Sequence, residues 1–268
     1  MIKGGGDVLL DTAAIVAGAG VVALPFVFVV LLPAPESWPY IAASVTIHLA
    51  YYFFMVNAYR VGDLSLVYPL MRGVAPLITA LAGVVWLREM PPAAAWLGML
   101  LISGGVMLLA LRSVDHAPSG RAIGFALANA VTIAAYTIVD GTGARLAGDP
   151  WGYIVWLFVL DAFPFTLYML LRRRPHREAA HHGGLHFVRA LWQRRQRAVI
   201  GGGLSAAAYA ISVWAMTQAP VALVASLRET SVLFATLIGA RLLRERLSAR
   251  RWAGVAAVAL GVVALKAA

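Results

Sequence analysis

The feature that most constrains this chain is an internal duplication. Residues 72–109 align without a gap with residues 228–265, and 13 of the 38 aligned positions are identical. The alignment pairs Arg72 with Arg228. Each copy consists of two long apolar stretches joined by a short charged turn. In membrane proteins, repeated bundles of apolar helices are typical of carriers, whose two related halves surround one central site.

The composition places this repeat in a membrane. The chain is 61% hydrophobic and 13% charged, with a mean hydropathy of +0.80, whereas soluble domains have roughly 45–50% apolar and about 25% charged residues. The net charge is +10, and the basic residues lie mainly in the segments between the apolar stretches. The positive-inside rule explains this distribution in a membrane protein. We therefore expect no nucleic-acid partner. The absence of cysteine excludes disulfides and thiolate chemistry. We predict no cofactor and no metal site. His181 and His182 lie in a loop and are only weak evidence for metal binding.

Nine apolar segments are close to the length of about 20 residues that a helix needs to cross a bilayer. They are 8–32, 39–59, 64–87, 91–111, 121–144, 151–171, 198–217, 219–240 and 251–267. Proline, glycine and charged residues mark the turns between them. The sequence therefore predicts an all-α, polytopic transmembrane bundle. The basic segment 172–197 ends in residues 185–197, which could form an interfacial helix.

A weaker match relates the starts of the two halves. Residues 2–6 resemble residues 139–143, but residues 120–137, which precede that match, have no counterpart in the first half. We therefore expect an intact design of two five-helix repeats, of which this chain has nine spans and lacks most of the first helix. Either that helix has been lost or the initiation codon was assigned late. The two repeats would be residues 1–113 and 114–268.

An odd number of helices in each half has a consequence for topology. The two halves enter the membrane from opposite sides, which makes an inverted repeat with substrate sites near the midplane. The loops on the side of Lys3 carry seventeen lysines and arginines, and the opposite loops carry three. This bias places the Lys3 side, including segment 172–197, in the cytoplasm. We expect an integral protein of a bacterial inner (plasma) membrane.

Short motifs in both copies give the chain a family resemblance. These are Tyr68–Pro76, the span ending in Leu87–Glu89, and residues 96–98 and 103–106, most of them with counterparts in the second copy. In these motifs the chain resembles the EamA-type branch of the drug/metabolite transporter superfamily. The resemblance implies ten helices, a cavity lined mainly by the first, third, fourth, sixth, eighth and ninth, and export of amino acids, related metabolites or drugs. The chain departs from the family in its missing first helix and in its charge bias, which places the C-terminus outside.

Two arginines inside predicted spans are the leading candidates for substrate binding. Arg72 lies roughly 6 Å along the helix axis from the centre of its span, and its repeat mate Arg228 approaches the midplane from the other side. A guanidinium binds carboxylate or phosphate through two parallel hydrogen bonds, so the pair suits an anionic group. Alternatively, each arginine pairs with a nearby acid or helix end and braces the fold. Adjacent helix positions point apart, so we expect Glu229 to face a different neighbour from Arg228.

Two aspartates are candidates for proton coupling. Asp161 lies near the middle of its span, where a buried carboxyl can carry a proton. Alternatively, it caps groups freed by Pro164 or faces a subunit contact. Asp140 lies near a span end, where an interfacial position competes with a coupling role.

Polar and aromatic side chains recur with helical spacing on several spans and suit a wet cavity with aromatic walls. The candidates for substrate binding are His48, Tyr52, Tyr68, Tyr136, Tyr209 and Trp214, with Tyr51, Met55, Asn129 and Thr132 on the same faces. Ordinary packing between helices is the alternative for each aromatic, and a hydrogen-bonded structural role is the alternative for the histidine. For the duplicated Glu89 and Glu245 we favour a structural role at the turn. The duplicated glycines Gly98, Gly105, Gly254 and Gly261 indicate close helix approach, in the scaffold or in a dimer.

Together these features predict a secondary carrier that exports small metabolites or drugs by alternating access. The chain has no Walker loop, so we expect no direct use of ATP. One alternative is a membrane enzyme acting on lipid, which would need a cluster of acids, bases or metal ligands. Another is a truncated protein that does not transport. The expected partners are a small-molecule substrate and the lipid bilayer. A homodimer is a further possibility.

Overall fold

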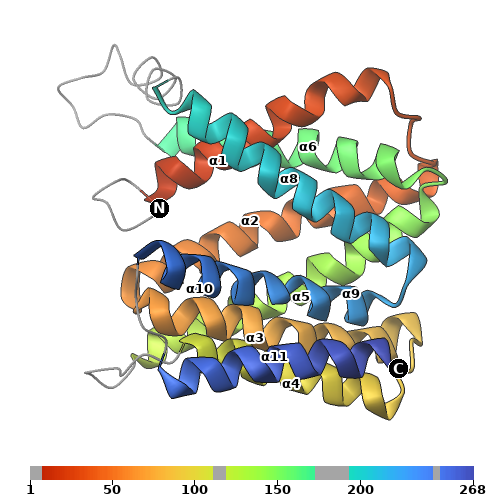
Figure 1. Cartoon of the computed structure of the whole chain (residues 1–268). Coiled ribbons are helices and arrows are strands. Elements are labelled where there is room, and N and C mark those ends of the chain that lie inside the picture. Colours follow the sequence, from red (N-terminus) through yellow and green to blue (C-terminus); the bar gives the residue numbers. More distant parts are fainter. Residues whose placement is uncertain (1–7, 111–118, 173–192, 244–247) are drawn as a thin grey trace. The chain divides into compact units, whose positions relative to one another are not determined.

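The structure is a computed structural model, and it describes residues 8–110, 119–172, 193–243 and 248–268. Within these residues every regular element is a helix (Figure 1). This confirms the predicted all-α class. The predicted interfacial helix lies largely outside the described residues, and so does Glu245.

Apart from the short η2, the described helices overlap the nine apolar segments predicted from the sequence. In chain order they are α1 (Val8–Ala23), η1 (Leu24–Phe28), η2 (Pro35–Ser37), α2 (Trp38–Val61), α3 (Leu64–Ala82), η3 (Gly83–Leu87), α4 (Ala93–Ala110), α5 (Gly120–Leu146), α6 (Pro150–Arg172), α8 (Arg195–Gln218), α9 (Val221–Arg228), α10 (Thr230–Leu243) and α11 (Ala249–Lys266). Each predicted segment holds one helix or two consecutive ones. The segment 219–240 is the notable case, because it is divided between α9 and α10.

Six described helical segments are long and apolar enough to cross a membrane. They are Pro35–Val61, Leu66–Leu87, Gly120–Leu146, Pro150–Leu167, Ala198–Gln218 and Val221–Ile238. Two shorter apolar helices cover Thr12–Phe28 and Ala93–Leu109. These lengths fit a polytopic bundle, whereas the count of nine spans and the inverted orientation of the halves stay predictions.

Packing divides the chain into two compact units, and each unit draws on both halves of the sequence. Unit 1 contains Met1–Leu49 and Thr142–Thr217, and unit 2 contains Ala50–Gly141 and Gln218–Ala268. Helices α2 and α5 contribute residues to both units. The units therefore differ from the two repeats, because a repeat is defined by sequence likeness and a unit by contacts. The division into two repeat domains stays a prediction.

In unit 2, α11 packs along α4 (Figure 1), and these two helices are repeat copies of each other. A Cβ built on Gly98 would lie 2.8 Å from the carbonyl oxygen of Gly261, and one on Gly105 would lie 2.8 Å from that of Gly254. No real Cβ tolerates such distances, so the helices approach each other at their glycines. The sequence left a scaffold or a dimer contact open for these residues. The structure places them against each other within one chain.

Unit 1 is held together by a similar close approach between other helices. A Cβ on Gly18 of α1 would lie 2.0 Å from the carbonyl oxygen of Ala198 in α8, and one on Gly20 would lie 2.4 Å from Cβ of Ala162 in α6. Beside this contact lies a core that includes the fully buried Tyr153. Both units are therefore tightly packed, which fixes the polar side chains that their helices carry.

Candidate functional site

Among the described residues, each unit holds a pair of ionisable side chains inside its helices. In unit 2, Nε of Arg72 is 2.8 Å from Oε2 of Glu229, and the two side chains are 20% and 4% exposed. In unit 1, Nδ1 of His48 is 3.5 Å from Oδ1 of Asp161, and the side chains are 12% and 13% exposed. All four residues belong to segments apolar enough to cross a membrane. Ionisable groups in such segments are expensive and commonly mark substrate or ion pathways.

The unit 2 pair lies at a break between two helices. Helix α9 ends at Arg228 and α10 begins at Thr230, so Glu229 lies between them. Its N–H donates to the carbonyl oxygen of Ser226, and its own carbonyl accepts from the N–H of Val232 at 3.0 Å. The interruption is a single residue, because Glu229 keeps right-handed helical backbone angles of φ −69° and ψ −16°, and Val221–Ile238 forms one apolar segment.

Three tyrosines surround the arginine of this pair. Tyr51 of α2, Tyr68 of α3 and Tyr136 of α5 are close enough to act electrostatically on Arg72. The Tyr51 and Tyr136 rings meet edge to face, with centroids 5.8 Å apart. Tyr52 is buried, and its ring contacts Tyr51 at 5.3 Å. The polar faces predicted on two separate spans therefore meet beside the arginine.

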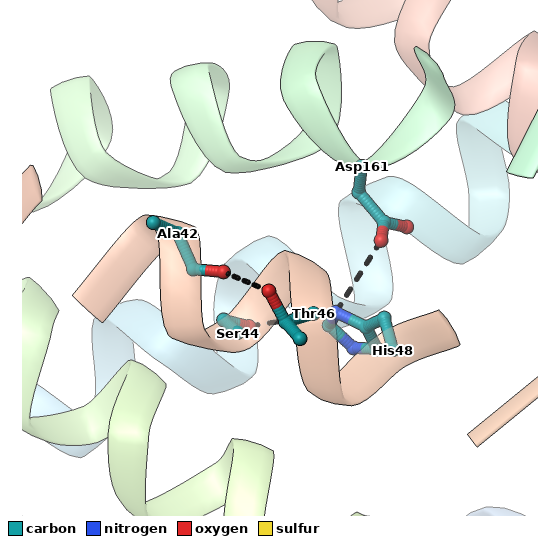
Figure 2. Close-up of polar contacts among 5 residues, drawn as sticks. All are labelled: Ala42, Ser44, Thr46, His48 and Asp161. Carbon is teal, nitrogen blue, oxygen red and sulfur yellow. Dashed lines mark hydrogen bonds and ion pairs between the residues drawn. The ribbon is translucent and has the colours of Figure 1, made fainter. Parts of the chain in front are cut away.

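The unit 1 pair brings together two residues that the sequence had assigned separate roles. Figure 2 shows Asp161 pointing from α6 toward His48 on α2. The Ser44 hydroxyl also lies 3.4 Å from Nδ1 of His48. The Tyr209 ring of α8 approaches the imidazole edge to face, with centroids 6.4 Å apart. Asp161 thus has an ionisable partner within the chain, and its role in proton coupling stays a prediction.

The remaining predicted residues lie at positions of very different exposure. Asp140 of α5 is fully buried in unit 2. Arg228 is half-buried at the end of α9, and Tyr68 is 37% exposed. Trp214 of α8 is 42% exposed in unit 1. Their roles in binding or coupling are untested.

The two companion residues on α5 are engaged by the protein itself. Nδ2 of Asn129 is 2.9 Å from Sδ of Met71, and the Thr132 hydroxyl donates to the Asn129 carbonyl oxygen at 2.8 Å. This packing links α5 to α3 directly beside Arg72, since Met71 precedes it in the sequence. The face of α5 that carries Tyr136 is therefore fixed in place.

Comparison with known proteins identifies the class. Residues 120–266 match the EamA-like transporter family. The chain belongs to this family. No curated protein matches it. A protein of known crystal structure aligns with a TM-score of 0.75 over 98% of this chain and 90% of its own, at 18% sequence identity.

The likeness to that crystal structure shows the fold alone, whereas the family match carries the functional class. An EamA-like protein is a membrane transporter of the drug/metabolite type, and the apolar helices agree with an integral membrane protein. The alternative of a lipid-modifying enzyme is not favoured by this membership.

In this EamA-like transporter, sequence reasoning gave Glu229 no role. It expected Glu229 and Arg228 to face different neighbours without naming one for Glu229, and the structure places the Glu229 carboxylate on Arg72. The two residues are far apart in sequence, so no local pattern could pair them. One signal was available, because the first copy has Gly73 at the position that Glu229 occupies in the second. A carboxylate that only one copy of the repeat places inside an apolar segment needs a positively charged or hydrogen-bonding partner.

Glu89 has a structural role, as expected, and one of its partners lies in the second half of the chain. Arg88 ends η3 in the left-handed region with φ of 54°, which turns the chain sharply. Oε2 of Glu89 then accepts a hydrogen bond from the N–H of Val221 at 2.9 Å. That N–H belongs to the first residue of α9 and would have no partner within its own helix. The acid therefore caps a helix of the second half.

Proposed function

We propose that this chain is a secondary transporter that exports small metabolites, such as amino acids and related compounds, or drugs by alternating access. One observation carries the proposal: helices apolar enough to cross a membrane hold the ionisable pairs Arg72–Glu229 and His48–Asp161. A protein with only a structural role has little reason to keep such groups in a membrane. Their presence in an EamA-like family member supports a path for polar solutes.

Substrate binding is assigned first to Arg72, together with its repeat mate Arg228. A guanidinium suits a carboxylate or phosphate group, which it binds with defined geometry. The aromatic side chains at Tyr52, Tyr68 and Tyr136 supply apolar walls with hydroxyl groups beside Arg72. In unit 1, the further candidates for binding are His48, Tyr209 and Trp214.

Proton coupling is assigned to Asp161, with Asp140 as the second candidate. The Asp161 carboxylate lies beside His48, and histidine is the side chain that ordinarily changes charge between pH 5 and 8. Gain or loss of one proton would therefore change the attraction between the two groups. A pair of this kind is suited to link a proton gradient to a change of conformation.

Flux into and out of vesicles tests the function. The purified full chain would be reconstituted in phospholipid vesicles and supplied with radiolabelled phenylalanine, glutamate, lysine and benzoate, with and without a pH gradient. We expect saturable flux of at least one probe, driven by the gradient and reduced by Asp161→Asn. The matched control is Glu36→Gln, which alters an exposed carboxylate of η2 and should behave as the unmodified protein. Folded protein without saturable flux of any probe would overturn the proposal, and conversion of labelled phospholipid would favour the enzyme alternative.

A further inference from the structure

The two copies of the repeat differ beside their shared arginine. Gly73 follows Arg72, whereas Glu229 follows Arg228. A Cβ at Gly73 would lie 3.1 Å from the carbonyl oxygen of Ser103, so close helix packing leaves little space for a larger residue there. The carboxylate of the second copy is therefore no part of the duplicated scaffold. It is an addition at the break between α9 and α10.

The charges around this carboxylate come from both copies. Arg72 lies 2.8 Å from Glu229, and Arg228 also acts on it electrostatically. The hydroxyl groups of Tyr51, Tyr68 and Tyr136 also act on Arg72, and Arg72 in turn acts on the hydroxyl group of Tyr59. With both arginines and the glutamate charged, the cluster carries one net positive charge. A partly buried group of charges with this balance attracts an anion.

We propose that the Glu229 carboxylate is an internal occupant of an anion site at Arg72, and that a carboxylate or phosphate group of the transported molecule displaces it. The inference rests on the proposed transporter function. In the state described, Glu229 contacts the guanidinium at the position that suits an external anion. Since both are negative, the two compete for Arg72.

Displacement has a consequence for protons. A displaced Glu229 would lie beside a second negative charge in a poorly hydrated interior, where like charges strongly disfavour each other. It therefore takes up one proton from water when the anion binds and returns it when the anion leaves. With a monoanion bound and Glu229 protonated, the cluster keeps the single net positive charge that it has at rest. Binding of one anion is thereby coupled to uptake of one proton.

The tyrosines define the rest of the ligand. The Tyr51 and Tyr136 rings come from two helices and meet beside the arginine. Aromatic side chains near a charged group accept an apolar or aromatic body whose anionic end faces the charge. The substrate class is therefore a small organic anion with an apolar body. Benzoate and phenyl phosphate are suitable probes, and benzamide is their uncharged counterpart.

Proton uptake by the purified full chain in detergent at pH 7 tests this coupling. Benzoate would be added in weakly buffered solution with a pH indicator, and its binding measured by calorimetry. Phenyl phosphate and benzamide would be tested in parallel. We expect saturable binding of at least one anion, no binding of benzamide, and uptake of close to one proton per bound anion. The benzoate affinity should fall as the pH rises, because the proton becomes harder to acquire.

Three variants separate the roles. Glu229→Gln should bind benzoate without proton uptake and with little dependence on pH. Arg72→Gln should lose at least tenfold in affinity, which corresponds to about 1.4 kcal/mol. Glu36→Gln should match the unmodified protein. If Glu229→Gln does not fold, infrared spectra of the unmodified protein decide instead, because benzoate must produce a new band of a protonated carboxyl group.

Each contrary result has a distinct meaning. Benzoate binding without proton uptake or a new carboxyl band would overturn the displacement of Glu229. Failure of both anions to bind, with vesicles in which another probe is still transported equally well by the unmodified protein and by Arg72→Gln, would overturn the anion site and leave the transporter function standing. Absence of saturable flux of every probe would instead overturn the proposed function.

Discussion

The ionisable pairs of the two units differ in distance, in chemistry and in the helices that carry them. In unit 2 the atoms of Arg72 and Glu229 are 2.8 Å apart at a helix break, and a guanidinium stays protonated in proteins. In unit 1 the atoms of His48 and Asp161 are 3.5 Å apart on two continuous helices, and an imidazole readily becomes neutral. Removal of the basic partner leaves a carboxylate that is 4% exposed in unit 2 and one that is 13% exposed in unit 1. We infer that the first pair holds structure until an anion competes for Arg72, and that the second pair is held less tightly.

The largest effect is expected from Arg72→Gln. This change strands the Glu229 carboxylate, which is 4% exposed, and loss of one partner of a buried ion pair costs about 3–5 kcal/mol. Unfolding of the purified protein in detergent, followed by circular dichroism against denaturant, measures the loss. The double variant Arg72→Gln/Glu229→Gln should recover most of it, because no charge is left unpaired. A double variant as unstable as the single one would show that the two residues are not coupled.

A smaller effect is expected where glycines bring helices together in either unit. Gly98→Ala in unit 2 and Gly18→Ala in unit 1 each place a Cβ against a carbonyl oxygen, at 2.8 Å and 2.0 Å. Overpacking of this kind costs about 1–3 kcal/mol. Gly104→Ala is the control, because its Cβ would meet nothing within 4 Å. Thermal unfolding measures all three. If Gly98→Ala and Gly104→Ala lowered the stability equally, then helix propensity, and not the contact between helices, would determine the effect of these substitutions.

The helix cap of unit 2 is expected to contribute less again. Glu89→Ala removes the acceptor for the N–H of Val221, and loss of a helix cap costs about 0.5–2 kcal/mol. The contrast with unit 1 is tested by Glu36→Ala, which removes an exposed acid from the first turn of η2. Hydrogen exchange at the start of α9 should rise in Glu89→Ala alone. Unchanged exchange there would mean that water replaces the carboxylate without cost.

The sequence predicted those features that depend on local pattern or on the duplication. Apolar segments predicted the helices, and duplicated glycines such as Gly98 and Gly261 predicted a close helix contact. The partner of Arg72 could not be predicted, because Glu229 lies far away in sequence and pairing depends on how α3 and α9 pack. The contact between His48 and Asp161 could not be predicted either, because it depends on how α2 and α6 pack. Periodicity indicates which residues share a face, whereas only the folded chain indicates which faces meet.

The smallest effect on stability, and the clearest effect on pH dependence, is expected from the unit 1 pair. His48→Gln removes the imidazole that lies beside Asp161 but keeps hydrogen-bonding capacity there. Loss of one such contact should cost about 0.5–1.5 kcal/mol, below the effect of Arg72→Gln. Initial rates of flux into vesicles, measured from pH 5 to 8, should lose their pH dependence in this variant while Glu36→Gln keeps it. If His48→Gln unfolds the protein as strongly as Arg72→Gln does, then the unit 1 pair is also a structural brace. The contrast between the two units would then be wrong.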